Sequence, residues 1–182
     1  MAHEFTTAYL KDSLSLFRYY KNLAERAMAQ CPDEGLFAEM DPESNSIAIV
    51  VKHLSGNMRS RWTDFLTTDG EKENRNRDGE FEMPCRTRAE LYDVWDSGWN
   101  CLFAALEPLQ EADLAKTVAI RGEPHSVMQA VNRQTAHYSY HVGQIVYLAR
   151  HYTGTTWKSL TVARKQSAQF NADIAAGKKS QR

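Results

Sequence analysis

The 182-residue sequence has few cysteines and no long apolar run. Its three cysteines, Cys31, Cys85 and Cys101, form no CxxC pair and leave an odd number, which argues against a disulfide framework. No apolar run approaches the roughly 20 residues that a membrane-spanning helix needs. The first residues, Met-Ala-His-Glu-Phe, lack the basic and apolar regions of a signal peptide. We therefore expect a soluble, cytoplasmic protein that does not bind membranes.

The sequence also lacks an excess of charge of either sign. It has 22 Lys and Arg against 23 Asp and Glu, and these charges are interspersed, so we expect no nucleic-acid partner. Hydrophobic residues at 42% and charged residues at 25% are ordinary values for globular proteins. The length suits one domain with a sizeable core. We predict a single domain over 1–182, in which about 173–182 form a frayed polar tail.

Four long segments repeat apolar residues every three or four positions, which predicts four helices. The first is expected over 5–30, because the residue before a proline disfavours the helical conformation and Cys31-Pro32 follows. The second is expected over 47–65, after a stretch of turn-forming residues. The third follows Thr87-Arg88-Ala89-Glu90, which has the spacing of a capping box.

The fourth helix is expected over 126–152, where Ser126 and Gln129 give a second capping-box match and Gly154 follows the end. Before it, 117–121 has the pattern of a short strand and Gly122-Glu123-Pro124 that of a tight turn. These signals predict an all-α protein, a four-helix bundle with a small β-hairpin before the fourth helix. A further short helical segment is expected within 157–171.

Three histidines occupy inward positions on two of these helices. His137 and His141 are four residues apart, so their side chains lie on one helix face, and His53 lies at the edge of the second helix's apolar stripe. Helical bundles build metal sites from such side chains, and three imidazoles favour Zn, Ni, Fe or Cu over Mg or Ca. Three protein ligands would leave a position for water or substrate. The alternative is a set of core histidines that bond to neighbouring helices.

Two other features are candidates for supporting such a site. Gln144, one turn after His141, could orient a liganding imidazole, or it could bond to backbone in the core. The irregular segment 67–86 is long enough to be a binding loop. Its Arg75 and Arg77 could contact an anionic substrate, since arginine binds carboxylate and phosphate bidentately. The alternative is a solvated connector whose arginines form weak surface ion pairs.

The sequence resembles the DinB/YfiT-like superfamily of metal-dependent bacterial proteins, and in particular a subfamily of unknown function. One stretch that carries the resemblance is VKHLSGNMRSRWTDFL at 51–66, which continues into TDGEK at 68–72. The other is NRQTAHYSYHVGQI at 132–145, followed by Trp157. After Trp157 the chain has Ala163 and Lys165, where the subfamily usually has Pro and Gly.

The resemblance implies a DinB-like four-helix bundle, often homodimeric, with a metal on His53, His137 and His141. Characterised relatives include thiol S-transferases, which join a low-molecular-weight thiol to an electrophile. We therefore expect a metal-dependent enzyme that uses Zn, Ni or Fe, a low-molecular-weight thiol and a small-molecule substrate, with its catalytic residues unassigned. The alternative is a non-enzymatic, metal-stabilised bundle that acts as a ligand-binding or stress-related protein.

Overall fold

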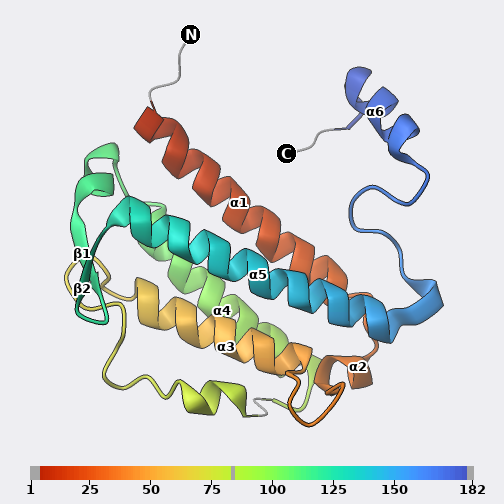
Figure 1. The fold of residues 1–182 in the computed structure, drawn as a ribbon, viewed down its shortest axis with the longest axis horizontal. Helices are drawn as coiled ribbons and strands as arrows, with labels where there is room; N and C mark the ends of the chain where they lie inside the picture. Colours follow the sequence, from red (N-terminus) through yellow and green to blue (C-terminus); the bar gives the residue numbers. More distant parts are fainter. Residues whose placement is uncertain (1–4, 83–84, 180–182) are drawn as a thin grey trace.

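The computed structural model describes residues 5–82 and 85–179 and is mostly helical (Figure 1). Its four long helices are α1 (Phe5–Met28), α3 (Ile47–Trp62), α4 (Arg88–Leu106) and α5 (Val127–Thr153). Each long helix contacts two others, in the cyclic order α1, α5, α3, α4. This arrangement confirms the predicted helical bundle.

The remaining elements are short. They are α2 (Asp33–Phe37), α6 (Ser167–Ala175), and 3-10 turns at Asp78–Phe81, Glu111–Ala115 and Gly154–Thr156. Figure 1 shows α6 set apart from the four long helices. It includes the first residues of the segment expected to be frayed, and the end of that segment, 180–182, lies outside the described residues. No helix in 5–82 or 85–179 is long and apolar enough to cross a membrane.

Both capping boxes form as predicted. The Thr87 hydroxyl accepts a hydrogen bond from the Glu90 backbone N–H, and the Glu90 carboxylate accepts one from the Thr87 N–H. Ser126 and Gln129 make the equivalent pair at the start of α5. Each box satisfies backbone donors that a helix start leaves unpaired. The two helices therefore begin where the sequence indicated.

The second predicted helix is three residues too long at its end. α3 stops at Trp62, and Asp64 adopts a left-handed conformation with φ of 47°, which turns the chain away. Phe65 nevertheless remains buried, with 6% of its surface exposed. The apolar period therefore continues past the last helical residue, which explains the error.

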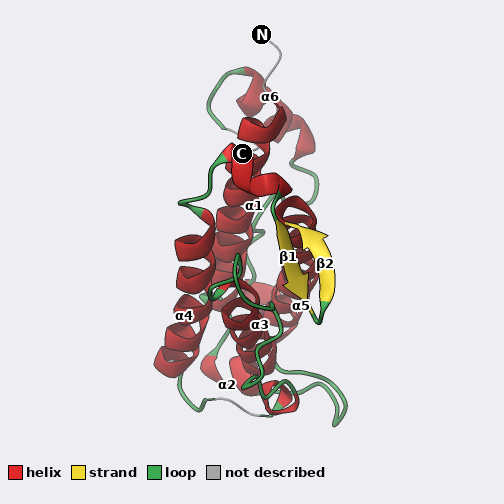
Figure 2. Cartoon of the chain, turned by 90° about the vertical axis from the view of Figure 1, so that its left-hand side faces the viewer, coloured by secondary structure: helices red, strands yellow, loops and turns green. Residues whose placement is uncertain are grey.

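The predicted hairpin is present as two antiparallel strands, β1 (Thr117–Ile120) and β2 (Glu123–Ser126) (Figure 2). Arg121 and Gly122 connect them with φ of 56° and 75°, the two positive values that a tight hairpin turn requires. Because Ser126 ends β2 and also caps α5, the hairpin determines where α5 starts.

The core contains one polar chain that joins α3 to α5. Tyr138 of α5 is fully buried between Phe17 and Trp99, with ring centroids 5.8 and 5.9 Å away. Its hydroxyl accepts a hydrogen bond from Trp62 Nε1 at 3.0 Å and donates one to Asn57 Oδ1 at 3.2 Å. These bonds fix the rotation of α5 against α3. Tyr138 directly follows His137, the first of the two histidines on α5.

Candidate metal centre

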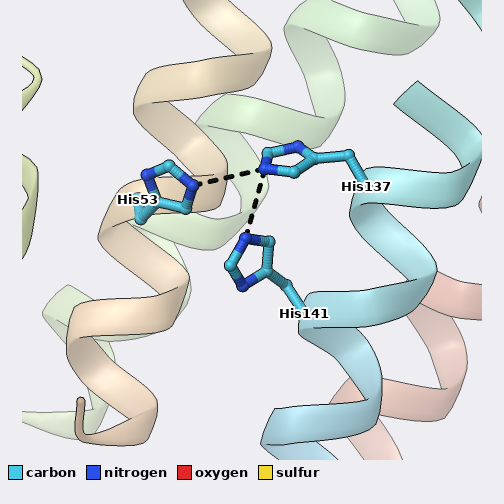
Figure 3. A group of neighbouring side chains, drawn as sticks. All are labelled: His53, His137 and His141. Carbon is cyan, nitrogen blue, oxygen red and sulfur yellow. Dashed lines mark hydrogen bonds between the residues drawn. The ribbon is translucent and has the colours of Figure 1, made fainter. Parts of the chain in front are cut away.

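The three histidines predicted from the sequence meet between α3 and α5 (Figure 3). His53 extends from α3, and His137 and His141 extend from consecutive turns of α5. His53 Nε2 lies 3.4 Å from His137 Nε2, which lies 3.2 Å from His141 Nε2. The potential ligand atoms all lie within 4.8 Å of one another. The structure therefore brings together side chains that are more than 80 residues apart in sequence.

In His53 and His141, Nδ1 points away from the cluster and Nε2 points into it. The hydrogen-bond partner of Nδ1 determines which of the two nitrogens carries the hydrogen. His53 Nδ1 lies 2.9 Å from Glu80 Oε2, and a carboxylate oxygen accepts, so Nδ1 carries the hydrogen. His141 Nδ1 lies 2.7 Å from Gln144 Oε1, which is likewise an acceptor. With its hydrogen on Nδ1, each of these rings in its neutral form directs the Nε2 lone pair at the centre of the cluster.

This arrangement fits a bound metal ion. His137 Nε2 faces the Nε2 lone pairs of His53 and His141 but carries at most one hydrogen, so it can donate to only one of them. A cation between the three nitrogens would bind all three lone pairs. Nitrogens held about 2.0–2.1 Å from a tetrahedral zinc ion lie roughly 3.3 Å apart. The observed separations of 3.4 and 3.2 Å lie on either side of that value. The donor type and these two spacings thus suit a transition metal.

The surroundings favour the neutral form of His137 and His141. Burial, with repulsion from His141, His53 and Arg133, lowers the pKa of His137 to about 3. Burial also lowers the pKa of His141, although the bond to Gln144 opposes it. Neutral imidazole is the form that binds metals, so these two rings are ready to bind at neutral pH.

Glu80 orients His53 and is itself held by Arg75. Arg75 Nε donates to Glu80 Oε1 at 2.8 Å, and Nη2 donates to Oε2 at 2.9 Å. Burial alone would raise the pKa of Glu80, but the bonds from His53 and Arg75 outweigh it and lower that pKa. The group therefore stays ionised beside the histidine. At metal sites, the ring nitrogen of a histidine that does not bind the metal commonly donates a hydrogen bond to a carboxylate.

Gly56 gives Glu80 the room to reach His53. A Cβ atom at Gly56 would lie 2.4 Å from Glu80 Oε1. The glycine in the middle of α3 thus allows the loop to approach closely. The role of Glu80 was not predicted from the sequence. A glycine in a buried helix, followed by a long acidic loop, is the only signal that could have indicated it.

The two arginines of the loop differ in their surroundings. Arg75 has a side chain only 5% exposed and also donates to Glu71 Oε2 at 3.1 Å, so two buried or half-buried carboxylates hold it. Arg77 is exposed, with its guanidinium 5.3 Å from the ring centroid of Phe81, which stacks on His53. Substrate contact by either arginine stays a prediction. The structure shows that Arg75 supports Glu80.

One side of the cluster is free of protein ligands within the described residues. No other His, Cys, Asp or Glu joins the three histidines as a potential ligand there. His137 and His141 are only half-buried, so the cluster is near solvent. His137 Nδ1 is buried without a hydrogen-bond partner in the same part of the chain. Three protein ligands with an open fourth position are typical of catalytic metal sites.

Together, the fold and the cluster define a helical bundle with a candidate three-histidine metal site. The chain belongs to the family described as "Protein of unknown function (DUF1572)", whose model matches residues 4–166. The matched range contains the three histidines, Glu80 and Gln144. No curated protein and no solved structure matches the chain. The resemblance to the DinB/YfiT-like superfamily therefore stays a prediction.

Proposed function

We propose that the protein is a metal-dependent enzyme whose metal, Zn, Ni or Fe, is held by His53, His137 and His141. The observation that carries this proposal is the convergence of three Nε2 atoms with no fourth protein ligand in the described part of the chain. A site built only for stability would be closed by a fourth protein ligand.

A divalent metal in such a site lowers the pKa of a bound thiol or water and so supplies a nucleophile at neutral pH. The residues of the chain supply the geometry. Glu80 keeps the Nδ1 hydrogen on His53, and Gln144 does the same for His141. Arg75 fixes Glu80 in turn. We infer a thiol S-transferase that joins a low-molecular-weight thiol to an electrophilic small molecule, with the sequence resemblance as the support for the thiol.

Metal analysis of protein purified without an affinity tag tests the site. We expect about one metal ion per chain in the wild type, and a large loss in His53→Ala, His137→Ala and His141→Ala. The matched control is His151→Ala, because His151 is exposed at the end of the same helix. Nearly unchanged metal content in all three cluster variants would refute the site.

A screen of bacterial thiols against electrophiles tests the reaction. We expect thiol consumption by the metal-loaded wild type, and none by the cluster variants or by protein treated with a chelator. Turnover by a metal-free protein would show that the chemistry does not need the cluster.

A second candidate is a non-enzymatic bundle that the metal stabilises, and the position of the cluster supports it. The histidines join α3 to α5, so a bound ion would connect two helices. Cobalt substitution separates the candidates. If the fourth position is open, an added thiol will change the cobalt absorption spectrum, and an unchanged spectrum would favour the stabilising role.

We also propose that the protein is a homodimer. The proposal rests chiefly on the resemblance, with weak support from Tyr140 and Tyr147, whose side chains are 63% and 66% exposed on α5. Sedimentation velocity should give twice the 20.8 kDa chain mass. A single 20.8 kDa species throughout the micromolar range would contradict it.

A further inference from the structure

A cavity of about 710 Å³ lies between α3 and the loop that follows it. The cavity is separate from the metal cluster. Glu80 forms part of its wall and contacts Nδ1 of His53, whereas the three histidines converge through their Nε2 atoms. Its volume lies within the range of about 300–1,000 Å³ found for small-molecule sites. Polar residues and glycines form the wall, and the charged side chains among them indicate what it could bind.

Two half-buried lysines line this cavity without a carboxylate partner. Lys72 Nζ donates to the Thr68 hydroxyl at 2.7 Å and to the backbone oxygen of Asp69. Lys52 Nζ donates to the backbone oxygen of Glu82 at 3.3 Å. Neither lysine forms an ion pair with any described residue. A cation removed from water without a counter-ion is costly.

The burial of Lys72 affects the pKa of its ammonium group. Burial lowers its pKa, even though Asp64 and Asp69 favour the charged form. An anion placed in the cavity would oppose that effect of burial and stabilise the charged lysine.

The third cation of the cavity, Arg59, makes no side-chain hydrogen bond or ion pair with the described residues and is exposed. Arg75, which also lines the cavity, and the neighbouring Arg61 differ, since each pairs with Glu71. The chain thus neutralises the arginines that support the loop and leaves Arg59 without a partner.

The acidic residues of the cavity do not cancel these charges. Glu80 is held by Arg75 and His53. Asp64 and Glu82 are exposed, whereas the two lysines are half-buried. The two lysines therefore make the inner wall cationic, whereas the rim carries the exposed Arg59 together with Asp64 and Glu82. This arrangement favours an anion that enters the cavity far enough to reach the lysines.

We propose that this cavity is a second binding site, which takes a small molecule with a doubly charged oxyanion through Arg59, Lys72 and Lys52. The oxyanion is a phosphate or a pair of carboxylates, which arginine binds through its planar fork and lysine as a point charge. The sequence prediction assigned an anionic substrate to Arg75 and Arg77. Arg75 also lines this cavity but is paired with Glu71 and Glu80, and Arg77 is not part of the wall. The proposal does not rest on the proposed function, because none of the three histidines lines the cavity.

Calorimetric titration of the full chain tests the site, with inorganic phosphate and succinate as probes at constant ionic strength. We expect saturable binding of one probe in both metal-loaded and chelator-treated protein, and the tighter probe identifies the oxyanion. Absence of saturable binding for both probes would overturn the proposal. Binding only in the metal-loaded protein would also overturn it, because the probe would then be a metal ligand.

Variants assign the binding to the cavity. Arg59→Ala and Lys72→Met should each weaken binding of the tighter probe at least about tenfold, which corresponds to 1.4 kcal/mol. The matched control is Arg164→Ala, an exposed arginine far from the cavity in sequence, which should bind like the wild type. Unchanged affinity in Arg59→Ala would overturn the proposal. That variant decides even if Lys72→Met disturbs the loop, because the Arg59 side chain supports no described contact.

Discussion

At the scale of single residues, the side chains behind the histidines determine what the histidines can do. Glu80 and Gln144 keep the hydrogens of His53 and His141 on Nδ1, so each Nε2 has a lone pair available for a metal ion. Tyr138 fixes the rotation of α5 through its bonds to α3. Each of these residues can be changed without removing a ligand.

Replacement of Glu80 by Gln tests the support of His53. The amide oxygen can still accept from Nδ1, but the charge that makes the ring more basic is lost, and Arg75 loses a carboxylate partner. We expect zinc affinity to fall about tenfold, the lower end of the range for such partners. Competition with a chromophoric chelator measures it. Glu82→Gln, an exposed change two residues later, is the control. Equal affinity in both variants would mean that Glu80 only packs against the histidine.

Replacement of Tyr138 by Phe tests the buried polar chain. The change leaves Trp62 Nε1 without its described acceptor and Asn57 Oδ1 without its donor. Unpaired buried groups cost about 1–3 kcal/mol, so the free energy of unfolding in urea should fall by that amount. Tyr147→Phe removes an exposed hydroxyl and should leave stability unchanged. A similar small effect in both variants would contradict the importance of the chain.

At the scale of elements, Asp69 joins the loop to the hairpin. One of its oxygens accepts from the backbone N–H of Glu71 at 2.7 Å and of Arg121 at 2.8 Å. The other oxygen accepts from the Gly122 N–H at 2.7 Å. The loop carries Glu80, and the hairpin sets the start of α5. This joint therefore bears on both sides of the metal cluster.

Asp69→Asn should loosen the joint, because the amide offers one acceptor oxygen in place of two charged ones. We expect a loss of roughly 1 kcal/mol in unfolding free energy at pH 7, a modest value because the carboxylate is near solvent. Hydrogen exchange should become faster at the amides of Glu71 and Gly122. Unaltered exchange at both amides would show that the joint is unimportant.

The contribution of Asp69 should also depend on pH. The bonds from the Glu71, Gly122 and Arg121 amides lower its pKa below the ordinary value of 3.8. Its stabilising effect is therefore fully present above pH 3.8 and is lost as the pH falls through the lower folded value. We expect the stability difference between wild type and Asp69→Asn to shrink on going from pH 7 to about pH 3. A difference that is constant over this range would contradict the assignment.

The sequence predicted those elements whose signals are local. Helical periodicity located the long helices and the three histidines, and Thr87 and Ser126 marked two helix starts. Contacts made across the chain were not predictable in this way. Glu80 reaches His53 only because the loop folds back over Gly56, and Phe65 is buried by packing after its helix has ended. Such contacts depend on tertiary structure, which periodicity does not encode.

At the scale of the whole molecule, the metal cluster connects helices that are distant in sequence. α3 and α5 also contact each other through the Trp62–Tyr138–Asn57 chain. Their other neighbours in the bundle are α4 and α1, respectively. An ion held by His53, His137 and His141 would therefore link the two halves of the bundle. An ion that binds only the folded chain must stabilise the fold.

Thermal unfolding with and without metal tests this coupling. At a free metal concentration of 100 times the dissociation constant, binding adds about 2.7 kcal/mol to stability. For a chain of this length that corresponds to a rise in Tm of roughly 5–10 °C. We expect the wild type to lose this increment when a chelator is added. His137→Ala should unfold at the same temperature with metal and with chelator, because one of the three ligands is gone. If the chelator shifted both proteins equally, the ion would act elsewhere on the molecule, and the link between α3 and α5 would be refuted.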